Sequence, residues 1–166
     1  VDKGKGHNMF MVDVLLHADN NSNSRVSVGV VAIKYDEKDV RSKYMLLDCH
    51  NGKLLSYTKT QKHGNSEVTQ ESYLNSKVEG GSLITILLDM RERTVDFCVN
   101  AHFYGQAFEI DRKEIDDLYF CVSLENQDDS VELLKLPDMN FAEEKLGLTY
   151  KMNNLETLYS DCYASQ

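Results

Sequence analysis

The chain has 166 residues, of which 42% are hydrophobic and 27% charged, with a formal net charge of −9 at pH 7 and a pI of about 5.0. This composition is typical of one globular domain with a buried core and excludes a disordered chain. The acidic balance and the lack of any basic run argue against nucleic acid as a partner, and no apolar stretch is long enough to span a bilayer.

The first half of the chain consists of short β segments separated by turn-forming residues. Segment 9–16, MFMVDVLL, alternates in polarity, and segment 26–33, VSVGVVAI, is rich in β-branched residues. Segments 44–49 and 54–58 flank Asn51-Gly52, a dipeptide that favours a hairpin turn. These features predict two pairs of strands joined by polar turns.

The second half continues the same pattern after a polar stretch, 59–73, which is predicted to be a long loop. Four more strands are predicted, over 83–90, 94–99, 118–124 and 131–134. The charged segment 109–117 is interpreted as a connector, with one helical turn as the alternative. Eight or more short strands without intervening long helices predict an all-β antiparallel fold, a sandwich or a barrel.

The character of the sequence changes after residue 135. Pro137, the only proline, marks a break, and Asn140 with Glu143 forms a loose capping box at the start of the segment FAEEKLG. Residues 152–163 have the composition of a second short helix. We therefore expect two units, a sandwich domain over 7–135 and a partly helical C-terminal tail over 136–166.

The cysteines and the N-terminus bear on where the protein works. The four cysteines are not spaced for zinc, and three of them lie in hydrophobic runs, at Cys49, Cys98 and Cys121. We expect reduced thiols and a cytoplasmic location, with the nucleus as the alternative. The chain opens with VDKGKG rather than Met, which suggests a piece of a longer, multidomain protein.

No sequence motif indicates catalysis, a cofactor or a metal site. The five histidines form no H-E-x-x-H pattern, and no G-x-S-x-G nucleophile motif occurs. Asp128 and Asp129, with Glu125 and Asn126, are calcium-type ligands, but the regular calcium-loop spacing is absent. A polar hairpin turn is the favoured interpretation of these four residues, so no catalytic, cofactor or metal residue is predicted.

Two other functions fit a β-sandwich and stay open at this stage. A carbohydrate-binding, lectin-like jelly roll stacks sugars on exposed aromatic rings and often binds calcium, whereas this chain has no Trp. A β-sandwich hydrolase requires two carboxylates that face each other across a concave surface. The strand carboxylates are chiefly Asp13, Asp48 and Asp96.

Six blocks of the chain, in order, resemble the SPRY domain family, and they cover about three quarters of the sequence. The blocks are KGHNMFMVDV at 5–14, VSVGVVA at 26–32, GSLITILLD at 81–89, RERTVDFCVN at 91–100, YGQAF at 104–108 and LYFCVSL at 118–124. Phe10 and Val26 stand where the family commonly has tryptophan, Thr85 and Ala101 where it commonly has glycine, and Phe120 where it has proline. The chain therefore resembles a divergent SPRY domain without the preceding PRY segment, with a concanavalin-like jelly-roll sandwich as its implied fold.

The resemblance implies a non-catalytic protein-protein interaction module that binds a peptide or protein partner through loops at one edge of the sandwich. Carried over by position, these loops are 35–43, 61–73 and 125–129. The residues expected to bind the partner are Tyr35, Asp36, Arg41, Tyr73, Glu125 and Asn126. Neither nucleic acid nor a membrane is an expected partner. An adaptor role in ubiquitin ligation would depend on RING, B-box or coiled-coil segments, which this sequence does not contain.

Overall fold

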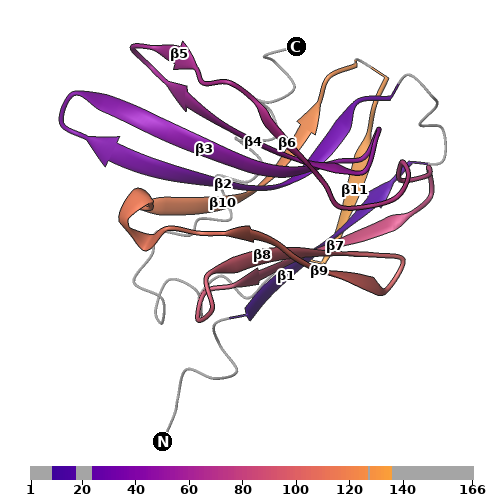
Figure 1. Ribbon diagram of the computed structural model, residues 1–166. Helices are drawn as coiled ribbons and strands as arrows, with labels where there is room; N and C mark the ends of the chain where they lie inside the picture. The colour runs from indigo at the N-terminus through magenta and orange to yellow at the C-terminus, as the bar shows by residue number, and fades with distance from the viewer. Residues whose placement is uncertain (1–8, 18–23, 127, 136–166) are drawn as a thin grey trace, which may run out of the picture.

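A computed structural model describes residues 9–17, 24–126 and 128–135 (Figure 1). These residues form two antiparallel β-sheets that face each other, as the sequence predicts. The expected helices of the tail, over 136–166, lie outside the described residues. Within the described part, no helix has the length and apolar character needed to cross a membrane.

The five-stranded sheet has the order β11-β1-β7-β8-β9. Its strands are β1 (Met9–Leu16), β7 (Leu83–Asp89), β8 (Thr94–Val99), β9 (His102–Glu109) and β11 (Val131–Lys135). Strict alternation in β1 and β7 turns Phe10, Val12 and Val14 toward the other sheet, and Ile84 and Ile86 face the same way. The apolar half of each strand therefore supplies one wall of the core.

The six-stranded sheet has the order β10-β2-β3-β4-β5, and β6 also pairs with β4. Its strands are β2 (Val26–Asp36), β3 (Asp39–Asp48), β4 (Lys53–Thr60), β5 (Gly64–Asn65), β6 (Thr69–Ser72) and β10 (Asp117–Leu124). Val28 and Val30 of β2 and Met45 and Leu47 of β3 face the first sheet and are buried against it. Phe97 of β8, fully buried, lies in the same core.

Two segments predicted as loops are more regular than expected. Strand β2 continues to Asp36 and β3 begins at Asp39, so 35–43 is a tight hairpin whose turn is Glu37-Lys38. The stretch 59–73 contains the end of β4 and the short strands β5 and β6. These pairings add a strand edge where polarity alone indicated only a loop, because polar residues on an exposed edge show no alternation.

The turns of the sequence blocks have the roles that their residue types predict. The Asp89 carboxylate accepts hydrogen bonds from the backbone N–H groups of Arg91 and Glu92. Asn100 is in the left-handed region, with φ of 50°, and its side chain accepts from the Leu83 N–H at 2.9 Å. Ala101 follows with φ of 66°, a conformation that favours glycine. The connector 109–117 contains one 3-10 turn, Arg112–Glu114.

Candidate partner-binding site

One end of the six-stranded sheet presents Tyr35 in a fixed position. We call this region the hairpin end; it comprises 33–43, 59–64 and 111–117. The Tyr35 side chain is 52% exposed, yet its hydroxyl donates to the Asp117 carboxylate at 2.6 Å and its backbone N–H donates to Asp116 at 2.7 Å. The bond to the Asp117 carboxylate raises the pKa of Tyr35 well above its ordinary value. The tyrosine is therefore exposed and held at both its backbone and its hydroxyl.

Further polar contacts hold the backbone around Tyr35. Lys34 Nζ lies 3.2 Å from Asp116, and the bond from the Tyr35 N–H together with this cation lowers the pKa of the Asp116 carboxyl. Asp39 Oδ1 accepts from the backbone N–H groups of Val40 and Gln61, which joins the hairpin turn to the end of β4. The hairpin end is thus fixed to both of its neighbouring strands before any partner arrives.

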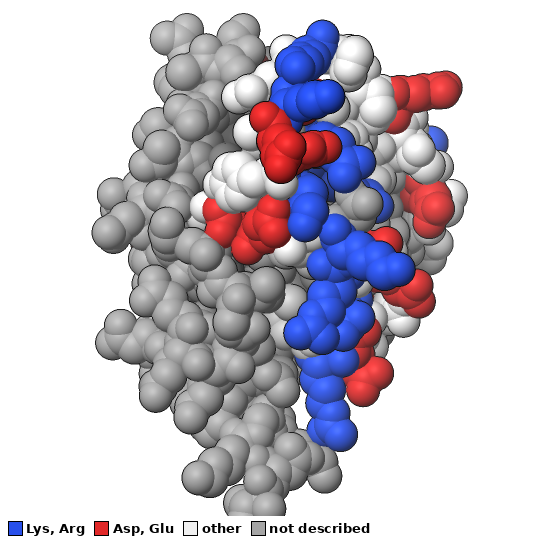
Figure 2. Space-filling view, turned by 90° about the vertical axis from the view of Figure 1, so that its left-hand side faces the viewer, with Lys and Arg blue, Asp and Glu red and all other residues white. Residues whose placement is uncertain are grey.

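The hairpin end carries a local excess of positive charge in an acidic protein. Its three segments contain eight Lys and Arg against seven Asp and Glu, a formal charge of +1, whereas the whole chain has −9. Viewed from this side, Lys and Arg side chains form a continuous stripe (Figure 2). Lys38, Lys43 and Lys62 are exposed and form no ion pair within the described part of the chain. These three cations are available to a partner.

The opposite end of the same sheet holds Glu125 and Asn126. We call this region the far end; it comprises 24–27, 48–53, 73–82, 99–102 and 125–130. Both residues are exposed, and the turn behind them is closed by Asp129, a buried carboxylate. Asp129 accepts from the Arg25 N–H at 2.8 Å and from the Asn126 N–H at 3.3 Å. This carboxylate stabilises the turn between β10 and β11, as the polar-hairpin interpretation requires.

Tyr73 also belongs to the far end, where it connects the two sheets. Its hydroxyl donates to the Gly105 carbonyl at 2.6 Å, and its ring packs edge-on against Phe97, with centroids 6.1 Å apart. Burial raises the pKa of Tyr73 to about 12. Much of this side chain therefore contacts the protein itself, which leaves a smaller surface for a partner than Tyr35 offers.

The six residues carried over from the family thus divide between two places. Tyr35, Asp36 and Arg41 lie together on the hairpin, where Tyr35 pairs with Val40 and Asp36 with Asp39. Tyr73, Glu125 and Asn126 lie at the other end of β2, about 30 Å from Tyr35 at the rise of an extended strand.

Sequence reasoning missed Asp116 and Asp117, the two residues that hold Tyr35. They lie 81 and 82 residues from Tyr35 along the chain, in a segment whose sequence predicts a charged connector. The only available signal is the position of Asp117 directly before the alternating strand 118–124.

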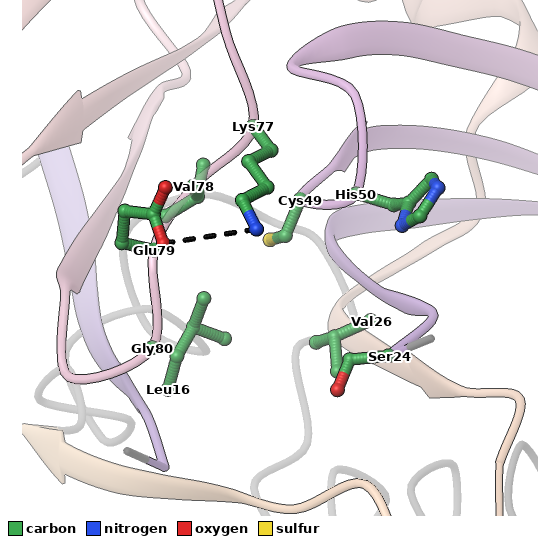
Figure 3. A pocket seen from close by; sticks show the side chains of 9 residues that line it. All are labelled: Leu16, Ser24, Val26, Cys49, His50, Lys77, Val78, Glu79 and Gly80. Carbon is green, nitrogen blue, oxygen red and sulfur yellow. Dashed lines mark ion pairs between the residues drawn. The ribbon is translucent and has the colours of Figure 1, made fainter. Parts of the chain in front are cut away.

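A small cavity between the sheets at the far end is unsuited to chemistry. Leu16, Val26 and Cys49 line it together with the pair Lys77 and Glu79, whose charged atoms lie 3.8 Å apart (Figure 3). Its volume of about 30 Å³ holds one or two water molecules, far below a substrate pocket of about 300 Å³ or more. Burial raises the pKa of the Cys49 thiol strongly, which makes it a poor nucleophile.

Of the three carboxylates considered for hydrolysis, two lie in one sheet and the third lies in the other. Asp13 and Asp96 belong to the five-stranded sheet, where Asp13 accepts from Thr85 and Asp96 accepts from the Ala107 N–H. Asp48 belongs to the six-stranded sheet, where it accepts from the His50 N–H. Among the described residues, no group of three or more His, Cys, Asp or Glu is arranged to hold a metal ion.

A sequence profile of the SPRY domain matches residues 8–136, which is most of the chain. The chain belongs to the SPRY domain family. SPRY domains are non-catalytic and generally act as protein-interaction modules. No curated protein matches the chain. The expected boundaries, 7–135 for the domain and 136–166 for the tail, stay a prediction.

Two solved structures resemble this sandwich. The SPRY domain of human HERC1 is 23% identical, with a TM-score of 0.50, and the match covers 77% of this chain and 75% of that one. A tetrameric galectin from the ball sponge Cinachyrella sp. is 12% identical, with a TM-score of 0.46, over 81% of this chain and 92% of the galectin. At these identities the HERC1 likeness supports the fold alone.

Proposed function

We propose that this SPRY domain binds a protein or peptide partner at the hairpin end, with Tyr35 as the aromatic anchor. The observation that carries the proposal is a half-exposed ring whose hydroxyl and backbone are both fixed by aspartates. A side chain ordered before binding loses little conformational entropy on contact, and tyrosine offers a large amphipathic surface. Aromatic anchors of this kind are frequent hot spots of protein interfaces.

The charge of the hairpin end supports a partner with acidic groups near its anchoring residue. A stripe of Lys and Arg runs along this side of the molecule (Figure 2). Arg41 lies directly across from Lys34 in the strand register. Local positive potential on an otherwise acidic protein orients an approaching partner and excludes binding in reversed orientations. Asp36 and Glu37, at the tip, would pair with donors of the partner.

The domain's setting is part of the proposal. Cys49 is a buried thiol and Cys98 a half-buried one, and neither forms a disulfide among the described residues, which supports a reducing compartment such as the cytoplasm or the nucleus. We infer that the domain serves as the recognition part of a larger adaptor protein. Chemistry, if that protein performs any, would lie in other domains.

The test compares the two ends of the sheet in one experiment. Affinity capture from cells, quantified by mass spectrometry, would use the wild type, a Tyr35→Ala plus Arg41→Ala variant and a Glu125→Ala plus Asn126→Ala variant. We expect bound partners to fall at least about tenfold for the hairpin-end variant, because truncating a hot spot costs about 1.4 kcal/mol or more. The far-end variant is the matched control and should retain them.

Two outcomes would contradict the proposal. Partners that survive the hairpin-end change and disappear with the far-end change would move the binding site to Glu125 and Asn126. Partners that survive both changes would place the site on neither end. Circular dichroism of each variant would establish that lost binding does not reflect lost folding.

A further inference from the structure

The six-stranded sheet has an outer face that points away from the five-stranded sheet (Figure 1). This face carries a second apolar cluster. In the strand register it forms two rows across β10, β2, β3 and β4. The first row is Tyr119, Val31, Tyr44 and Tyr57, and the second is Cys121, Gly29, Leu46 and Leu55. The outward face of a sandwich sheet ordinarily bears polar residues, so this face resembles a core.

The exposed fractions of several of these side chains are as low as those of a covered surface. Val31, Leu46, Tyr119 and Cys121 are 0–6% exposed, although no described helix or strand forms a third layer over them. On the outer face of the five-stranded sheet, by contrast, the apolar Met9 and Met11 keep 49% and 37% of their surface exposed. A groove of about 580 Å³ lies over the end of both rows, at Leu55 and Tyr57, and extends to Val68.

We propose that the C-terminal segment 136–166 of this same chain docks on the outer face of the six-stranded sheet. Three other stretches lie outside the described residues, namely 1–8, 18–23 and 127, and all are short and polar. Only 136–166 combines the length with enough apolar residues to cover two rows of a sheet. It is also permanently attached, which gives it a high effective concentration at this face.

The sequence of the segment fits the shape of the face. Met152, Leu155, Leu158, Tyr159 and Cys162 recur at helical spacing, so a helix over 152–163 would have one apolar stripe. A helix this short is marginal in water and needs an apolar surface to pack against. Its length of about 18 Å compares with about 14 Å between the outermost of four neighbouring strands.

The segment can also reach the face. β11, which leads into it, is the edge strand of its sheet and follows β10, the edge strand of the six-stranded sheet, through the short turn 125–130. Both edges lie on the same side of the sandwich (Figure 1). The residues between Lys135 and Met152 span up to about 55 Å when extended, which is ample to pass around β10.

Thiol labelling of the full chain tests this proposal, because Cys121 lies in the second row and Cys49 in the core between the sheets. The test variant is Leu155→Asp plus Leu158→Asp, which breaks the apolar stripe without touching the sandwich. We expect the alkylation rate of Cys121, measured by peptide mass, to rise at least tenfold, while Cys49 stays unreactive. The matched control, Asn153→Asp plus Thr157→Asp, adds the same charge off the stripe and should leave both rates unchanged.

Hydrogen exchange on the same proteins provides a second readout. In the wild type, amides in 152–163 should exchange at least tenfold more slowly than in the Leu155→Asp plus Leu158→Asp variant. Equal Cys121 labelling and equal exchange in wild type and variant would overturn the proposal. Protection that falls on a hundredfold dilution of the protein would also overturn it, because the occupant would then be a second copy of the chain.

Discussion

The hairpin end and the far end of the six-stranded sheet are both held by carboxylates, but these carboxylates have different roles. At each end a carboxylate accepts from a backbone N–H group in a distant part of the chain: Asp116 from Tyr35 at the hairpin end, and Asp129 from Arg25 at the far end. At the hairpin end the carboxylates also hold an exposed tyrosine. At the far end, the contacts of Asp129 within the described part of the chain are with backbone N–H groups, so that this carboxylate closes a turn.

The two ends therefore differ in role: the hairpin end exposes a residue to a partner, whereas the far end closes a turn. A residue that binds a partner must stay accessible, and the cost of ordering it is met inside the domain by Asp116 and Asp117. A residue that closes the sandwich can be buried, as Asp129 is, because nothing needs to reach it. Changes at the far end should therefore alter folding stability more than binding, and changes at the hairpin end should do the reverse.

The largest expected effect on stability is that of Asp129→Ala. Two backbone N–H groups, of Arg25 and Asn126, would lose a buried charged acceptor, which costs about 2 kcal/mol in the free energy of unfolding. Urea denaturation would measure it, with the exposed neighbour Asp128→Ala as a control that changes stability by less than about 0.5 kcal/mol. Partner capture should stay at the wild-type level, and its loss would contradict the expectation that changes at the far end affect stability rather than binding.

The pKa values of the tyrosines at the two ends are raised by different causes. Tyr35 has a raised pKa chiefly through its bond to Asp117, whereas the pKa of Tyr73, about 12, is raised chiefly by burial. We therefore expect Asp117→Asn to lower the pKa of Tyr35 and to leave that of Tyr73 near its wild-type value, as NMR titration of the ring resonances would show. A parallel fall of both pKa values would contradict these separate causes.

The same titration has a consequence for stability. A tyrosine whose folded pKa lies above its unfolded value, near 10, stabilises the fold fully below pH 10. That contribution is lost as the pH rises from 10 toward the raised values, because the unfolded chain ionises first. The wild type should lose stability in this alkaline range, and Asp117→Asn should lose less, since its Tyr35 would titrate nearer to the unfolded value.

Ala101→Gly should stabilise the far end. Ala101 is in the left-handed region with φ of 66°, where a Cβ costs about 1 kcal/mol that glycine avoids. We expect the free energy of unfolding to rise by about this amount, less the added flexibility of the unfolded chain. Thermal unfolding would measure the gain, and Ala107→Gly, within β9, is the matched control that should destabilise.

The sequence predicted the sandwich because alternation and turn residues are local signals. Phe10, Val12 and Val14 alternate within one strand, and Asp89 with Asn100 marks two turns directly. The candidate site was harder to predict because its parts are distant in the chain. Nothing in the sequence near Tyr35 indicates that Asp117 accepts a hydrogen bond from its hydroxyl. The position of Glu125 in the family pattern alone could not show that it lies at the other end of β2.

The smallest expected effect is that of Lys34→Gln at the hairpin end. Lys34 and Asp116 are both about one-third exposed, and ion pairs in such positions contribute little, so the Tm should shift by less than about 2 °C. The pKa of Asp116 is lowered first by the Tyr35 N–H and only second by Lys34. NMR titration of the Asp116 carboxyl should therefore show a pKa still below 3.8 in the variant. The hydrogen bond from the Tyr35 N–H to the ionised Asp116 carboxylate would then be fully present above the ordinary carboxyl pKa. It would be lost only as the pH falls through the lowered pKa of Asp116. A carboxyl that returned to its ordinary pKa would instead make Lys34, rather than the hairpin backbone, the group that holds Asp116.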